Sequence, residues 1–118
     1  MADSPIQSKS MDFSIRVVRM YQYLTREFHE FVLSKQLLRS GTAIAANIRE
    51  ARYAQSRRDF VSKLSIALKE ASETQYWLDL LYRTDYLDAA AHQSIITDCD
   101  ELVKLLTSIV KSSKLTLA

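Results

Sequence analysis

Basic residues are concentrated in one stretch of the chain, and their types and spacing suggest binding to an anion. Residues 35–63 carry seven lysines and arginines against two acidic residues, a net charge of +5, while residues 1–34 are neutral and residues 64–118 carry −3. Arginines with an aromatic side chain among them suit phosphate contacts and base stacking. The sequence therefore predicts a nucleic-acid-binding surface made of Arg49, Arg52, Tyr53, Arg57, Arg58 and Lys63.

An ordinary solvated surface is the alternative to this interpretation. An excess of positive charge also arises when the partner carboxylates lie on a neighbouring helix. The stretch contains no named nucleic-acid-binding motif. Both interpretations stay open on the sequence alone.

Metal and acid–base chemistry have weaker support. A di-iron centre in a helical bundle needs Glu-x-x-His on two helices, and neither His29 nor His92 follows an acidic residue by three positions. Glu50 and Glu73 could act as an acid and a base, with His29 beside them, but pairs of helical carboxylates are common. Cys99 lies on an apolar stripe, where a small buried side chain is expected. We therefore expect no enzymatic activity, no metal and no cofactor.

The elements that must position these side chains are all helices. In 118 residues the chain has one glycine (Gly41), one proline (Pro5) and one asparagine (Asn47), too few for the turns of a β-rich fold. No apolar run approaches the roughly 18 residues of a membrane span. The N-terminus lacks the apolar region of a signal peptide, and a single cysteine fits a reducing compartment, so a cytoplasmic location is expected.

Apolar residues recurring every three or four positions predict four helices, at about residues 12–28, 35–54, 57–83 and 89–112. Short connections between them predict an antiparallel up-down-up-down bundle over residues 12–112. Residues 1–11 are expected to be a disordered tail and residues 113–118 to fray, and Met11 could be an alternative start. The expected N-caps, which would accept the free N–H groups of the first turns, are Asp12 or Ser14, Ser34, Ser56 and Asp88.

Gly41 falls inside the second predicted helix, where a glycine costs about 1 kcal/mol relative to alanine. Small residues surround it in the sequence (Ser40, Ala43, Ala45 and Ala46). Close approach of another backbone is therefore the favoured explanation, and a tolerated defect is the alternative.

Two helices carry a second stripe, beyond the one that a monomeric bundle needs to bury. The third predicted helix has Ile66, Glu70, Glu73, Trp77 and Leu80 at helical spacing, with Tyr76 beside them, and the second has Ser40, Ala43, Asn47, Glu50 and Ala54. We interpret these stripes as a subunit interface in which Asn47, Glu50 and Glu73 fix the register. The alternatives are apolar residues scattered on the surface and solvated polar ones.

Two segments carry a family resemblance: FVLSKQLLRSGTAIAANIREA, Phe31 to Ala51, and RRDFVSKLSIALKEASETQYWLDLL, Arg57 to Leu81. Over roughly residues 12–111 the chain resembles the bacterial four-helix bundle proteins first met as open reading frames in intervening sequences of 23S ribosomal RNA genes. The family pattern S-x-x-x-x-x-x-N-I-x-E-G/A falls on Ser40, Asn47, Ile48, Glu50 and Ala51, and its glutamate of the third helix falls on Glu73. Many members have glycine where this chain has Ala45 or Ala51.

The resemblance implies a cytoplasmic up-down bundle that assembles as a homopentameric ring. The family is also similar in architecture to the accessory protein of diversity-generating retroelements, a basic pentamer that binds nucleic acid and a reverse transcriptase. The favoured function is therefore a non-enzymatic, oligomeric nucleic-acid-binding or accessory protein. The alternative is a protein–protein interaction scaffold that uses Tyr53, Tyr76 or Trp77.

Overall fold

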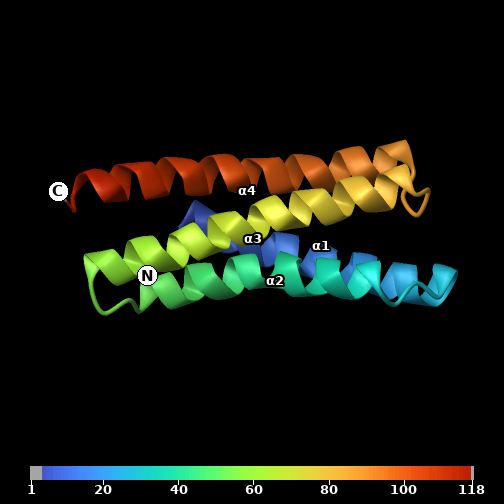
Figure 1. Cartoon of the computed structure of the whole chain (residues 1–118), viewed down its shortest axis with the longest axis horizontal. Helices are drawn as coiled ribbons and strands as arrows, with labels where there is room; N and C mark the ends of the chain where they lie inside the picture. The colour runs from blue at the N-terminus through green and yellow to red at the C-terminus, as the bar shows by residue number, and fades with distance from the viewer. Residues whose placement is uncertain (1–3, 118) are drawn as a thin grey trace.

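Four antiparallel helices make up the fold in the computed structural model, which describes residues 4–117. They are α1 (Pro5–Phe28), α2 (Leu33–Arg52), α3 (Arg57–Arg83) and α4 (Ala89–Leu115). Each helix packs on the next one along the chain, and α1 touches α4 more sparsely (Figure 1). The expected all-α class and up-down order are confirmed.

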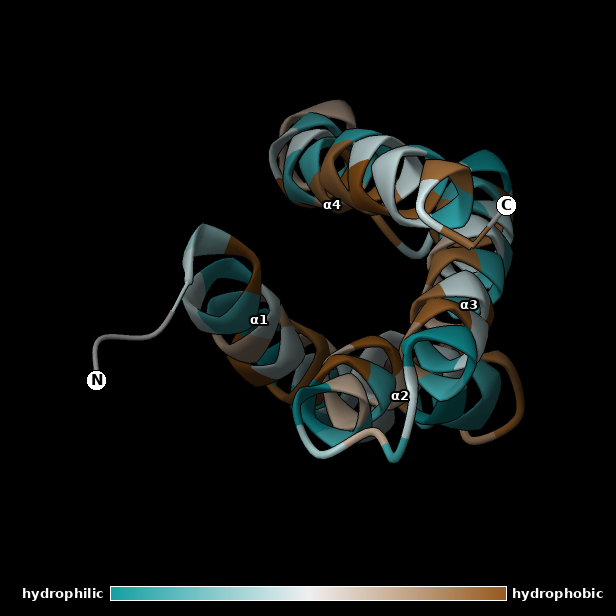
Figure 2. Ribbon diagram, turned by 90° about the vertical axis from the view of Figure 1, so that its left-hand side faces the viewer, coloured by the Kyte–Doolittle hydropathy of each residue, from teal (hydrophilic) through white to brown (hydrophobic). Residues whose placement is uncertain are grey.

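The core is formed by the stripes that helical spacing predicted. Seen along the bundle, the four helices form an arc, and their apolar faces turn towards its inside (Figure 2). Most stripe residues are fully buried, and Met20, Phe60 and Ile109 are half-buried at the margins. The largest fully buried apolar side chains are Phe13, Val17, Leu24, Leu37, Ile44, Leu78, Leu81, Ile95, Leu102 and Leu106.

The first helix begins seven residues earlier than predicted. Pro5 occupies its first position, where a missing N–H leaves no hydrogen bond unmade, and Gln7 Oε1 accepts a bond from the Ser4 N–H at 3.3 Å. Ser10 is buried and Ile6 packs against the core. The expected disordered tail is therefore wrong for residues 5–11, and residues 1–3 lie outside the described part. Asp12 and Ser14 are internal helical residues and not caps.

The last helix also runs further than predicted, to Leu115. Ser113 is buried, so the expected fraying from residue 113 is wrong for residues 113–115. Residues 116 and 117 form a turn, and the final residue, 118, is not among those described.

The start of α2 is fixed by Glu30 and not by Ser34. The Glu30 carboxylate accepts hydrogen bonds from the N–H groups of Val32, Leu33 and Ser34 at 3.0, 3.0 and 2.8 Å. Burial by itself would raise the pKa of Glu30, but these bonds outweigh it and hold that pKa below its ordinary value of 4.5. His29 has a left-handed backbone, with φ of 53°, which turns the chain between α1 and α2.

The other two caps are confirmed. Ser56 Oγ accepts a hydrogen bond from the Asp59 N–H at 3.0 Å, and the Asp59 carboxylate reaches back to the Gln55 N–H at 3.2 Å. Asp88 Oδ1 accepts a bond from the Ala91 N–H at 2.7 Å. The predicted first residues of α3 and α4, Arg57 and Ala89, therefore hold.

Gly41 is buried at the contact between α2 and α1. A Cβ placed on Gly41 would lie 2.7 and 2.8 Å from the two γ-methyl carbons of Val17. Real Cβ atoms do not approach so closely, so only glycine fits without a shift. The expected close packing is confirmed, but the expected close backbone is wrong, because the group that approaches Gly41 is the Val17 side chain of α1.

Candidate nucleic-acid-binding surface

The predicted basic residues lie mainly at one end of the bundle, where α2 ends at Arg52 and α3 begins at Arg57. This end is at the left of Figure 1. Five side chains are exposed there, and 75% of the Tyr53 surface is accessible to solvent. We call this set the basic end: Arg49, Arg52, Tyr53, Arg57 and Arg58.

Lys63 differs from the other predicted residues because it has a partner on the neighbouring helix. Its Nζ lies 3.4 Å from Glu50 Oε1, which ties α3 to α2. Its side chain is also partly shielded, at 31% exposure. For Lys63, the alternative in which the charge is balanced by the next helix is therefore correct.

Three arginines of the basic end have no such carboxylate. Within residues 4–117, neither Arg49, Arg57 nor Arg58 has an acidic oxygen within 4.0 Å. The Arg57 guanidinium instead lies 5.7 Å from the centre of the Phe60 ring. Ion pairing inside the chain thus leaves a net positive charge at this end.

A groove between α1 and α2 leads to the basic end. It has a volume of about 380 Å³, and Arg49 and Arg52 line it together with polar side chains of α1, among them Gln7, Ser10 and Ser14. Arg49 and Arg52 therefore face α1, while Arg57 and Arg58 lie in the first turn of α3. This groove could not be predicted from the sequence, because most of its α1 wall (Gln7, Ser10 and Met11) falls in the segment expected to be a tail.

The second stripe of α3 lies beside α2, along the seam between the two helices. Arg39 Nη1 lies 2.9 Å from Glu70 Oε2, and Arg39 also pairs with Glu73. Trp77 Nε1 donates to the same Glu73 carboxylate at 2.9 Å. Hydrogen bonds from Trp77 and Arg39 hold the pKa of Glu73 below its ordinary value. The predicted interface residues Glu70 and Glu73 therefore already have partners within the chain.

The small and polar stripe of α2 is likewise partnered internally. Thr74 Oγ1 lies 3.0 Å from Ser40 Oγ, and both residues are fully buried. Asn47 Nδ2 donates to the carbonyl oxygen of Ala43 at 2.8 Å. Ser40 therefore belongs to the core, which leaves Ala43, Asn47 and Glu50 as the α2 residues on the outside of the seam.

The α3 side of the seam keeps an apolar surface. Ile66 is 41% exposed and Tyr76 is 57% exposed, and Trp77 and Leu80, further along α3, are half-buried. The Tyr76 and Trp77 rings meet edge to face with centres 4.9 Å apart. We call this set the seam face: Ile66, Tyr76, Trp77 and Leu80.

The residues considered for catalysis do not come together. Glu50 pairs with Lys63, which precedes Glu73 by ten residues on α3, or about 15 Å of helix. His29 lies beyond the end of α1 and contacts Phe31. An acid–base site built on Glu50, Glu73 and His29 is therefore not assembled by this fold.

Cys99 behaves as expected for a core residue. It is fully buried, and desolvation raises the pKa of its thiol to about 12. In the described part of the chain, no three or more His, Cys, Asp or Glu side chains gather closely enough to hold a metal ion. None of the described helices is long and apolar enough to cross a membrane.

Comparison with known proteins gives a family and a solved structure that is similar over most of the chain. The sequence profile of the 23S rRNA-intervening sequence protein family matches residues 2–108. A crystal structure of a protein of unknown function from the S23 ribosomal protein family of Bacteroides thetaiotaomicron is 57% identical in sequence. The match covers 90% of this chain and 98% of that one, with a TM-score of 0.89. No curated protein matches the chain.

Proposed function

The chain belongs to the 23S rRNA-intervening sequence protein family, and from that premise we propose that it is a non-enzymatic nucleic-acid-binding protein acting through the basic end. The family description names no enzymatic activity, and the solved relative is described as a protein of unknown function. Both family names refer to ribosomal components, which makes RNA the first nucleic acid to test.

The observation that carries this proposal is the set of unpaired arginines. Arg49, Arg57 and Arg58 are exposed and lack carboxylate partners in the described chain. Phosphate groups can supply the missing counter-charge without the cost of breaking an existing ion pair. Tyr53 presents an exposed ring between these cations, where an unpaired base can stack.

The seam face supports the proposal that the protein also binds copies of itself. Exposed apolar residues at helical spacing, rimmed by the Arg39, Glu70 and Glu73 cluster, are typical of a helix-packing surface. A ring of copies would repeat the basic end around its axis, and each copy would add its own phosphate contacts. The family resemblance favours five copies.

Titration of fluorescently labelled single-stranded RNA and of a matched duplex, at several salt concentrations, tests the nucleic-acid proposal. Each lost phosphate contact should lower the slope of log affinity against log salt by about 0.7 for single strands. Arg57→Gln with Arg58→Gln should reduce both the affinity and that slope. Lys35→Gln removes an exposed charge from the start of α2, at the other end of the bundle, and should change neither.

Absence of binding at low salt would refute the proposal, as would an equal effect of the Lys35 variant. A protein–protein scaffold is the second candidate function. The apolar seam face could bind another protein, and such a scaffold would not need the basic end. Light scattering on the wild type and on Ile66→Glu with Tyr76→Glu tests self-association through the seam face, and the RNA titration separates the two roles. Self-association through the seam face predicts a multimer that this variant dissociates, and a monomeric wild type would contradict it.

A further inference from the structure

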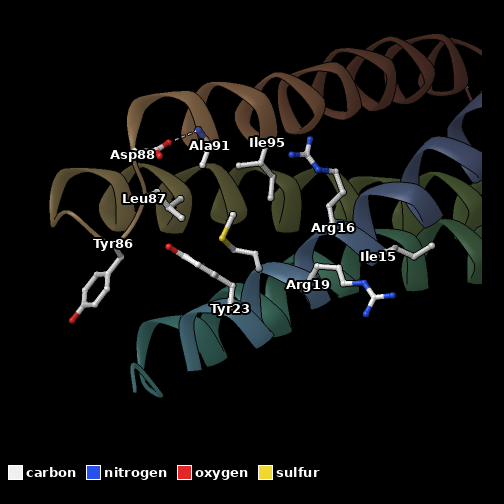
Figure 3. Close-up of a pocket in the computed structure, with 10 residues that line it drawn as sticks. Ile15, Arg16, Arg19, Tyr23, Tyr86, Leu87, Asp88, Ala91 and Ile95 are labelled. Carbon is white, nitrogen blue, oxygen red and sulfur yellow. Dashed lines mark hydrogen bonds between the residues drawn. The ribbon is translucent and has the colours of Figure 1, made fainter. Parts of the chain in front are cut away.

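A pocket of about 440 Å³ lies between α1 and the first turns of α4, near the α3–α4 connection and away from the basic end. It exists because α1 touches α4 more sparsely than consecutive helices touch one another. Figure 3 shows residues of α1 facing residues of the connection and of α4 across this space.

The floor of the pocket is apolar. Leu87 and Ile95 are buried core residues, and the half-buried Met20 completes the surface. Tyr23 and Tyr86 stand at one end, and both contact Phe28 edge to face, with ring centres 5.6 and 5.5 Å apart. Tyr23 is 47% exposed, so the pocket opens to solvent beside an aromatic wall.

The other end is closed by Arg16, which bridges the two helices. Its guanidinium donates to Asp98 Oδ2 at 2.7 Å, and to the carbonyl and hydroxyl oxygens of Ser94 at 3.1 and 3.0 Å. From Arg16 to Tyr23 the pocket follows seven residues of helix, or about 10 Å. Because the pocket is short and closed at one end, it admits a single ring or a short alkyl chain. A partner helix would need a groove that continues past both ends, so this pocket does not fit one.

One cation at the rim remains available to a ligand. Arg19 lines the pocket, makes one weak hydrogen bond to Gln22 Oε1 at 3.4 Å, and has no ion pair in the described chain. The Arg16 charge is already balanced by Asp98. Asp88, on the opposite rim, is held as the cap of α4, and its charge repels an anion. A negatively charged group is therefore favoured at Arg19 and disfavoured near Asp88.

We propose that this pocket binds a small amphipathic carboxylate, with its ring or short alkyl chain on Met20, Leu87 and Ile95 and its carboxylate at Arg19. The apolar floor supplies most of the binding free energy through buried area. Arg19 selects the anionic form and fixes the orientation of the ligand. This site is separate from the basic end, so the proposal does not depend on whether the protein binds nucleic acid.

Titration of the ¹⁵N-labelled protein with 3-phenylpropionate, followed by amide chemical shifts, tests the proposal. The neutral 3-phenylpropanamide serves as the matched ligand. Saturable shifts should cluster at residues 15–23 and 86–95, with the carboxylate binding more tightly than the amide. Arg19→Gln should weaken carboxylate binding by about threefold to tenfold and leave amide binding unchanged.

Two variants make the result decisive. Arg26→Gln removes an exposed arginine two turns further along α1, outside the pocket lining, and should have no effect. Ala91→Phe should fill the pocket and abolish binding of both ligands, with folding checked by circular dichroism. Equal losses in the Arg19 and Arg26 variants, shifts spread over the whole molecule, or no saturable shift at millimolar ligand would each overturn the proposal.

Discussion

Gly41→Ala should destabilise the protein, although alanine is the better helix former. The added Cβ would lie 2.7 and 2.8 Å from the Val17 γ-methyl carbons and 3.2 Å from the Val17 Cβ. Val17 is fully buried, and its β-branched side chain has one strongly preferred rotamer in a helix. The methyl groups therefore cannot rotate away, and the two helices must separate to admit the new atom.

The expected size follows from two opposing contributions. Replacing a mid-helix glycine with alanine gains about 1 kcal/mol of helix propensity. Overpacking a well-filled core costs about 1–3 kcal/mol. The net loss in free energy of unfolding is therefore about 0–2 kcal/mol, and each kcal/mol lowers the Tm by about 4 °C for a chain of this length.

Urea unfolding followed by far-ultraviolet circular dichroism, at one protein concentration for all variants, measures these changes. Ala46→Gly, on an exposed turn of the same helix, measures the propensity difference without a steric contact. Val17→Ala removes the two methyl groups. In the Val17→Ala background only the contact with the Cβ of residue 17, at 3.2 Å, remains, so Gly41→Ala should become stabilising by up to the amount that Ala46→Gly costs.

Two results would refute this reasoning. One is that Gly41→Ala stabilises the protein by the full propensity difference, which is the amount of stability that Ala46→Gly loses. The other is strict additivity of Gly41→Ala and Val17→Ala, because atoms in steric conflict must show a coupling energy.

Three further predictions concern buried polar groups. Glu30→Gln should cost about 1–2 kcal/mol of stability, since the carboxylate accepts three backbone bonds at the start of α2. The pKa of Glu30 is lowered on folding, so the ionised carboxylate contributes fully to stability above the ordinary pKa of 4.5, and this contribution is lost as the pH falls through the folded pKa. The urea midpoints of Glu30→Gln and the wild type should therefore converge in acid. A difference that stays constant with pH would be evidence against the cap. Thr74→Val should cost more stability than Ser40→Ala. In Ser40→Ala the remaining Thr74 hydroxyl keeps its bond to the Glu70 carbonyl oxygen at 2.8 Å, whereas in Thr74→Val the remaining Ser40 hydroxyl keeps only a bond of 3.5 Å to the Leu37 carbonyl oxygen. Urea denaturation of both variants checks this order. Cys99 should resist a thiol reagent at about pH 8 until the protein unfolds, since burial raises its pKa to about 12, and rapid labelling of the native protein would contradict the packing described.

Local patterns in the sequence were enough to predict four helices and most of the core. The apolar spacing from Phe60 to Leu81 predicts which face of α3 is buried, without any knowledge of where the neighbouring helices lie. The residues of this stripe are buried except Phe60, which is half-buried. Gly41 stood out for the same reason, since a residue of poor helix propensity inside a strong helical pattern needs a packing explanation. Ser56 and Asp88 were also predictable, because their hydrogen bonds join residues three apart in the sequence.

The first turns of α1 could not be predicted in this way. Residues 5–11 have no strong apolar periodicity, and they are helical with Ile6 against the core and Ser10 buried. Glu30 is not among the predicted caps because glutamate is not one of the usual N-cap residues, although its hydrogen bonds reach only two to four residues ahead. Packing of Ile6 against the core decides the first of these features, whereas the Glu30 cap is a local contact that the residue type alone does not indicate.

Residue spacing and composition are enough to predict the helices, the buried stripes and the concentration of positive charge in residues 35–63. Which of those charges are balanced depends on how the helices pack. Lys63 meets Glu50 and Arg39 meets Glu70 and Glu73, while Arg49, Arg57 and Arg58 meet no carboxylate in the described chain. The physical reason is that helical period is a property of neighbouring residues, whereas an ion pair depends on which faces of two helices are packed together.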